Sequence, residues 1–176
     1  MSGAAAGSRR QSGILEAEEF ALAMPAGARL MGLDVGSKTL GLALSDVTRT
    51  IASGLTTQSR TKFSADARRL LELVEEHGVG GLVLGLPINL DGSEGPRAQA
   101  TRAFARGLAR LTAIPILFWD ERLSTAAAER TLLEADMSRR RRAQVIDKVA
   151  ATLILQGALN RLKLLTSARA GRDGAK

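Results

Sequence analysis

The segment from Arg29 to Asp46 constrains the fold of this chain more than any other stretch. It has two apolar halves separated by Gly36-Ser37-Lys38, a pattern typical of two β-strands joined by a tight turn. A single carboxylate, Asp34, interrupts the first half. Alternate residues of a strand share a face, so Asp34 is expected on the same side as Gly32 and Gly36, where a ligand or metal ion could approach the backbone. The plainer alternative is a turn aspartate that caps Gly36 or Ser37.

Strand and helix patterns alternate after this hairpin. Apolar runs predict further strands at 51–58, 81–86 and 114–119. Helical spacing predicts helices at 63–77 and 96–111, a helix capped by Ser124 or Thr125 that runs to about Ala135, and a last helix with Ile146, Val149, Leu153 and Gly157 on one stripe. This order predicts an α/β fold with a mixed five-stranded sheet and helices on both faces, as in RNase H-like folds.

The predicted domain spans residues 29–165, a length that suits one hydrophobic core. Residues 1–28 are expected to form a flexible N-terminal extension with a short amphipathic helix before Pro25. Polar and basic composition predicts a linker at 137–142 and a loose tail at 166–176.

Composition narrows the chemistry. The sequence has no cysteine and one histidine, His77, which excludes disulfides and thiolate chemistry and disfavours a catalytic triad or a histidine-rich metal site. Any acid–base or metal chemistry therefore falls to carboxylates. The formal net charge of +7 favours polyanion partners, nucleic acid foremost. No apolar run approaches the ~18 residues of a membrane span, so no membrane partner is expected.

Three acidic positions are predicted to converge at the carboxyl ends of the strands, where α/β sheets gather their ligands. Asp34 is on the first strand, Asp120 and Glu121 follow the fifth, and Asp147 is in the first turn of the last helix. Each has a structural alternative, because Asp120 or Glu121 can pair with Arg122 and Asp147 can favour the helix dipole. Together, such carboxylates repel unless a divalent ion neutralises them, and Mg²⁺ or Mn²⁺ prefers oxygen ligands.

Basic residues around these acids are candidates for binding nucleic acid. They are Lys38, Arg97, Arg122 and the run Arg139, Arg140, Arg141 and Arg142. The run immediately precedes Asp147, although charge runs are commonly only solvated linkers. The loop Asn89–Gly95 opens onto a helix and could present backbone N–H groups to a phosphate.

Four segments resemble the YqgF (RuvX) family in order: 33–46 (LDVGSKTLGLALSD), 85–93 (GLPINLDGS), 120–125 (DERLST) and 146–151 (IDKVAA). The resemblance covers roughly residues 29–165. It implies an RNase H-like fold related to the RuvC Holliday junction resolvases, and a cytoplasmic nuclease that processes the 5′ end of pre-16S ribosomal RNA. It further implies that Asp34 and Asp147 are catalytic metal carboxylates. RuvC places another acid where this chain has Leu86-Pro87, so Glu121, or its neighbour Asp120, is taken as the remaining ligand.

Three functions are weighed from the sequence. The first is a metal-dependent endonuclease acting on structured RNA, or on DNA junctions, with Asp34, Glu121 and Asp147 as ligands. The second is a non-catalytic RNA-binding ribosome assembly factor. The third, an actin-like phosphotransferase, is suggested by Asp-x-Gly and Lys-Thr but needs two domains, for which the chain is too short. The oligomeric state is left open between a monomer and a homodimer.

Overall fold

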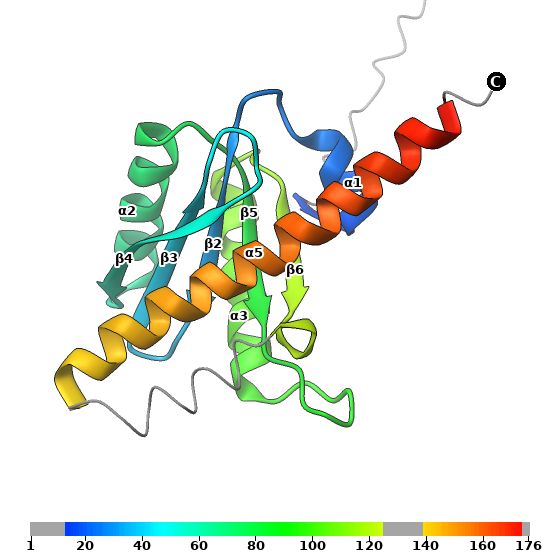
Figure 1. Cartoon of the computed structure of the whole chain (residues 1–176). Helices are drawn as coiled ribbons and strands as arrows, with labels where there is room; N and C mark the ends of the chain where they lie inside the picture. Colours follow the sequence, from blue (N-terminus) through cyan, green and yellow to red (C-terminus); the bar gives the residue numbers. More distant parts are fainter. Residues whose placement is uncertain (1–12, 125–138, 174–176) are drawn as a thin grey trace, which may run out of the picture.

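The computed structural model describes residues 13–124 and 139–173 (Figure 1). Its elements, in chain order, are β1 (Ile14–Leu15), α1 (Ala17–Ala23), β2 (Arg29–Val35), β3 (Thr39–Ser45), β4 (Ala52–Ser59), α2 (Phe63–Glu76), β5 (Val79–Leu86), α3 (Pro96–Leu111), β6 (Ile116–Asp120), the 3₁₀ turn η1 (Glu121–Leu123) and α5 (Arg139–Asp173). The predicted helix from 125 to about 135 lies outside the described residues. Within the described part, no helix is long and apolar enough to cross a membrane.

The strands form one six-stranded sheet in the order β1-β6-β5-β2-β3-β4. β2, β3 and β4 are antiparallel neighbours, whereas β2, β5 and β6 are parallel to one another. This confirms the predicted mixed sheet of an RNase H-like fold. The strand count of five was wrong by one, because the two-residue β1 pairs with β6 at the edge of the sheet. So short a strand leaves no alternation in the sequence by which to recognise it.

Helices cover both faces of the sheet and enclose two apolar layers. α2 and α3 lie behind the sheet in Figure 1, over Met31, Leu33 and Val35. α5 crosses the front face diagonally and packs its Ile154 and Leu155 against that side of the sheet. β2 therefore separates two environments, and its alternate residues belong to one layer or the other, as its pattern predicts.

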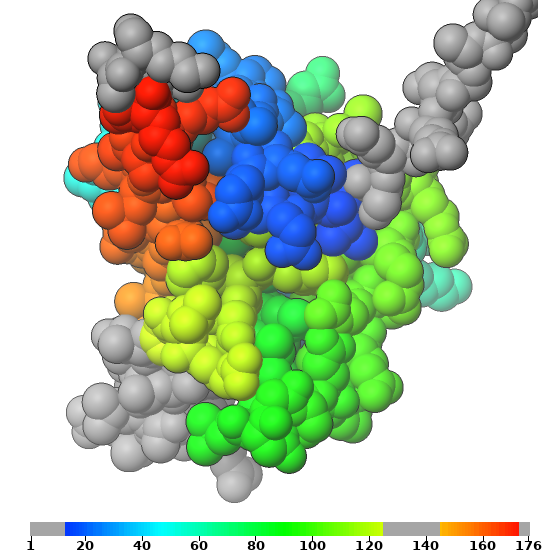
Figure 2. All heavy atoms as spheres, turned by 90° about the vertical axis from the view of Figure 1, so that its right-hand side faces the viewer, coloured from blue at the N-terminus to red at the C-terminus, as the bar shows by residue number. Residues whose placement is uncertain are grey.

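The N-terminal extension is packed from Gly13 onward, where flexibility was expected. Phe20 of α1 is fully buried in the layer beneath α5, and Ile116 of β6 donates its N–H to Gly13. Figure 2 shows α1 lying against the C-terminal part of α5. The predicted short helix before Pro25 is present as α1, and it contributes Phe20 to the apolar layer beneath α5.

The last helix is much longer than its sequence pattern predicts. α5 begins at Arg139, so the segment Arg139–Arg142 is helical where a linker was expected, and it continues to Asp173 where a loose tail was expected. Asp147 consequently lies about two turns inside the helix and not in its first turn. An interaction with the helix dipole, which fades within the first turn, no longer explains this residue.

Candidate active site

Asp147 of α5 packs on Gly41, the β3 residue paired with Asp34 of β2. Asp34, 1% exposed, lies directly opposite Gly41 in the antiparallel register. A Cβ atom added to Gly41 would be 2.2 Å from the carbonyl oxygen of Asp147 and 2.9 Å from its Cβ. Opposite residues of such a pair have Cβ atoms about 4.5–5.5 Å apart on one face. The side chains of Asp34 and Asp147 thus start from neighbouring points on the α5 face of the sheet.

Glu121 reaches the same face from the other side of Asp34. In the parallel pairing of β2 with β5, Leu33 lies opposite Leu84. Asp34 and Gly85 are the next residues of these two strands, so Gly85 lies beside Asp34. A Cβ on Gly85 would be 2.8 Å from the Oε1 atom of Glu121. Glu121 is 5% exposed. The three predicted acids therefore occupy one end of one face of the sheet, at the carboxyl ends of β2 and β5 and under α5.

Asp120 is directed elsewhere. Its carboxylate accepts hydrogen bonds from the Arg122 side chain, with Nη2 at 2.7 Å, and from the Arg122 backbone N–H at 3.0 Å. The hydrogen bonds from Arg122 lower the pKa of Asp120. The structural alternative considered for this residue, pairing with Arg122 at the start of a helical turn, is the arrangement observed. Glu121 is two residues after Trp119, which packs in the layer beneath α5, so strand alternation gives the two residues the same face.

Asp147 and Asp34 each have a polar neighbour at this face. The Thr39 hydroxyl donates to Oδ2 of Asp147. The half-exposed Arg97 places Nη2 3.7 Å from Oδ1 of Asp34. Among the described residues, no three Asp, Glu or His side chains are arranged as a ready metal cage. The donor chemistry nevertheless suits a hard divalent ion, since the three acids are carboxylates on one face and a cation is already drawn to Asp34.

The cations predicted to bind nucleic acid are placed unevenly. Arg97, in the first turn of α3, is beside Asp34, and Lys38 is in the β2–β3 turn next to it. Arg122 is committed to Asp120 and also donates to the Asn89 carbonyl at 3.5 Å. Arg139, Arg140, Arg141 and Arg142 form the start of α5, and their side chains lie outside the described residues.

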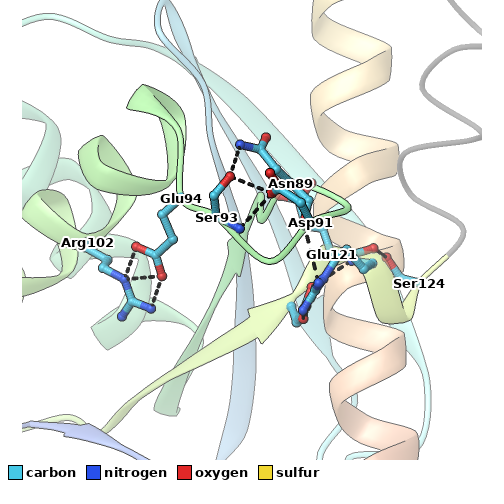
Figure 3. A network of polar contacts seen from close by, with 9 residues as sticks. Asn89, Asp91, Ser93, Glu94, Arg102, Glu121 and Ser124 are labelled. Atoms are coloured by element: carbon cyan, nitrogen blue, oxygen red, sulfur yellow. Dashed lines mark hydrogen bonds and ion pairs between the residues drawn. The ribbon is translucent and has the colours of Figure 1, made fainter.

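The loop Asn89–Gly95 is tied together internally, as Figure 3 shows beside η1. Asp91 accepts from the Ser93 N–H at 2.9 Å and from its hydroxyl at 2.6 Å, which lowers the pKa of Asp91. The N–H groups of Asn89 and Gly92 have acceptors inside the loop. Glu94 is paired with Arg102 of α3, which lowers the pKa of Glu94. These amides are therefore occupied, which argues against the predicted phosphate cradle.

Sequence reasoning missed Thr39, Gly41 and Gly85. Each was visible within a quoted motif, but its role depends on a helix more than a hundred residues away or on a neighbouring strand. Asp46, which matched a motif without a role, accepts from the N–H groups of Thr50 at 2.7 Å and Ile51 at 3.0 Å and shapes the β3–β4 loop. His77 caps the C-terminus of α2 near the start of β2, at the other end of the sheet.

Comparison with known proteins identifies the family of this chain. A family model described as "RuvX: Holliday junction resolvase" matches residues 28–161. A protein of Paracoccus denitrificans named "Putative pre-16S rRNA nuclease" is 64% identical over 148 residues, which cover 84% of this chain and 94% of the relative. A Rhodobacter capsulatus protein of the same name is 61% identical over 82% of this chain and 91% of its own length.

Among solved structures, Thermus thermophilus RuvC bound to a Holliday junction matches with a TM-score of 0.48 and 14% identity, over 75% of this chain and 93% of that chain. The predicted enzyme class, a nuclease acting on ester bonds, is confirmed at the level of the family. The family model spans all four motifs and all three carboxylates described above, and the chain belongs to the RuvX family.

Proposed function

We propose that this protein is a metal-dependent endonuclease that hydrolyses phosphodiesters of structured RNA and processes the 5′ end of pre-16S rRNA in the cytoplasm. The observation that carries the proposal is the gathering of Asp34, Glu121 and Asp147 on one face at the carboxyl ends of β2 and β5. Asp34 and Glu121 are buried and Asp147 is partly buried, and carboxylates placed together on one face need a compensating cation. The names of the relatives at 64% and 61% identity support rRNA as the substrate.

In this proposal Asp34, Glu121 and Asp147 hold Mg²⁺ or Mn²⁺, which supplies an activated water and stabilises the leaving oxygen. Glu121 is preferred to Asp120 as the middle ligand because Asp120 is neutralised by Arg122. Thr39 orients Asp147 by donating to one carboxylate oxygen. Arg97 is half-exposed beside Asp34 and is suited to grip a phosphate of the bound strand.

A DNA-junction resolvase is the second candidate, favoured by the description of the matching family model. The same carboxylates serve either substrate, since phosphate contacts carry no sequence information. A non-catalytic RNA-binding assembly factor is the third candidate. It predicts binding without any metal-dependent product.

The deciding experiment incubates the protein with a labelled 16S precursor and, in parallel, a labelled four-way DNA junction, across a Mg²⁺ and Mn²⁺ titration. We expect metal-dependent cleavage of the RNA near the mature 5′ end. Asp34→Asn should abolish cleavage and leave RNA affinity within about threefold, because the lost charge is a metal ligand and not a phosphate contact. Asp46→Asn is the matched control, since Asp46 lies at the opposite end of β3.

The outcomes separate the candidates. Cleavage of the junction alone would establish the resolvase. Binding of RNA with no product at any metal concentration would favour the assembly factor. If Asp34→Asn lost cleavage only in proportion to lost folding, measured by thermal melting, Asp34 would not be a ligand.

A further inference from the structure

Arg60 follows β4 and contacts both ends of the β2–β3 turn. Its backbone N–H donates to the Lys38 carbonyl at 2.8 Å, and Nη1 of its guanidinium donates to the Gly36 carbonyl at 2.6 Å. Arg60 is not among the acids or nucleic-acid contacts proposed above, and it contacts one of them, Lys38, only through its backbone carbonyl. One residue therefore fixes the turn at two points.

The turn that Arg60 fixes is the connection between the two aspartates of the site. Asp34 lies two residues before Gly36, near the end of β2. Thr39 is the first residue of β3, and its hydroxyl donates a hydrogen bond to Asp147. The Gly36 N–H donates to the Thr39 carbonyl at 2.9 Å and closes the turn. A Cβ on Gly36 would itself lie 2.9 Å from that carbonyl oxygen, so the turn is tight. Movement of Gly36 would move Thr39 and change its donation to Asp147.

Arg60 is itself held in place from the α2–α3 side of the sheet. Its guanidinium carbon is 5.4 Å from the centre of the Phe104 ring. Its Nε is 3.8 Å from Oδ2 of Asp66, whose side chain is only 2% exposed. Asp66 is also bound by Thr61 and by Arg69, whose Nη2 is 2.7 Å from Oδ1. A guanidinium that packs on a ring, is near a buried carboxylate and donates to the Gly36 carbonyl has few other positions to adopt.

We propose that Arg60, supported by Asp66, is a positioning residue for the reaction: it holds the β2–β3 turn so that Thr39 and Asp34 present their groups correctly to Asp147 and the metal. This inference rests on the proposed nuclease function. Burying Asp66 is costly unless its partners compensate it. A turn needed only to join two strands is satisfied by its own Gly36–Thr39 hydrogen bond, so the additional network points to positional control.

The test compares Arg60→Gln with Arg69→Gln. Both changes remove a cation from Asp66, but only Arg60 contacts the turn. We expect Arg60→Gln to lower kcat for RNA cleavage about tenfold, with KM within about twofold, as is typical when a partner that orients a ligand is lost. Arg69→Gln should keep kcat and KM within about twofold. Arg60→Lys, which keeps the charge beside Asp66, should recover part of kcat.

Amide hydrogen exchange provides a readout independent of activity. In Arg60→Gln the Gly36 amide should exchange about tenfold faster than in the wild type, and in Arg69→Gln it should be unchanged. Equal losses of kcat in the two glutamine variants, in proportion to their melting temperatures, would overturn the inference. Unchanged exchange at Gly36 in Arg60→Gln would overturn it as well. If the wild type does not cleave RNA at all, the nuclease proposal fails, and the exchange data alone decide whether Arg60 holds the turn.

Discussion

A methyl group at position 41 should damage the site more than its size suggests. In Gly41→Ala the new Cβ would be 2.2 Å from the Asp147 carbonyl oxygen, whereas ordinary contact needs at least 3.4 Å. The obstacle is helix backbone and cannot rotate away, so α5 must retreat by about 1 Å or more. Overpacking of this kind costs about 1–3 kcal/mol, which for a domain of this size lowers Tm by about 2–12 °C. Displacing a catalytic group by about 1 Å can lower the rate about a hundredfold.

The assay measures thermal melting and metal-dependent RNA cleavage for Gly41→Ala and for a matched variant, Gly54→Ala. A Cβ on Gly54 would meet the Cγ of Lys148, at 2.6 Å, so it approaches the same stretch of α5. The Lys148 side chain can rotate aside, and we expect Gly54→Ala to keep most of its activity. Equal activity in the two variants would refute the reasoning, because it would mean that Asp147 does not depend on the close approach of α5 to Gly41.

Three further predictions follow from single contacts. Thr39→Val removes the hydroxyl that orients Asp147 but keeps a β-branched strand residue, so cleavage should fall about tenfold with a smaller loss of Tm than in Gly41→Ala, and an unchanged rate would contradict that role. Hydrogen bonds, first from Thr48, lower the pKa of Asp46 from 3.8 to about 2. The ionised carboxylate thus stabilises the fold above about pH 4 and loses this effect toward about pH 2, so Asp46→Asn should lower Tm at pH 7, with a difference that disappears on acidification. Phe20→Ala should cost about 3–5 kcal/mol in urea unfolding because Phe20 is fully buried, and a cost below about 1 kcal/mol would show that α1 is not part of the core.

The hairpin could be predicted from the sequence because its signals are local. Apolar alternation, the glycines and the short polar turn lie within one segment, and the structure pairs Met31 to Val35 with Leu40 to Leu44 accordingly. The C-terminal part of α5 could not be predicted in this way. Its residues beyond Thr166 are exposed and carry no large apolar side chain, and in the described structure the C-terminal part of α5 lies against α1, whose sequence is some 140 residues away. Tertiary packing, and not propensity, sustains most helices.

The choice between Asp120 and Glu121 shows the same limit at the site. Alternation places Asp120 opposite Trp119 and Glu121 on the face of Trp119 only if β6 continues past Trp119, and the predicted strand ended there. The outcome depends on η1, which uses the Asp120 carboxylate as its cap and turns Glu121 over Gly85. A cap of this kind is a local preference that competes with metal ligation for the same oxygen atoms. Sequence patterns show that an acid is present at this point, but not which of the two neighbouring carboxylates is bound by Arg122.

The glycines explain how acids so distant in the chain share one site. Gly41 and Gly85 flank Asp34 on its two neighbouring strands, and a side chain at either position would meet Asp147 or Glu121. The space beside Asp34 is therefore left by missing side chains and is filled by residues of α5 and by Glu121. By contrast, the ion pair of Arg97 with Asp34 is long and half-exposed, and such pairs contribute little to stability. The fold thus holds Asp34 and Asp147 together through close packing of α5 on Gly41, and the proposed contact of Arg97 with a phosphate would not require Arg97 to keep Asp34 in place.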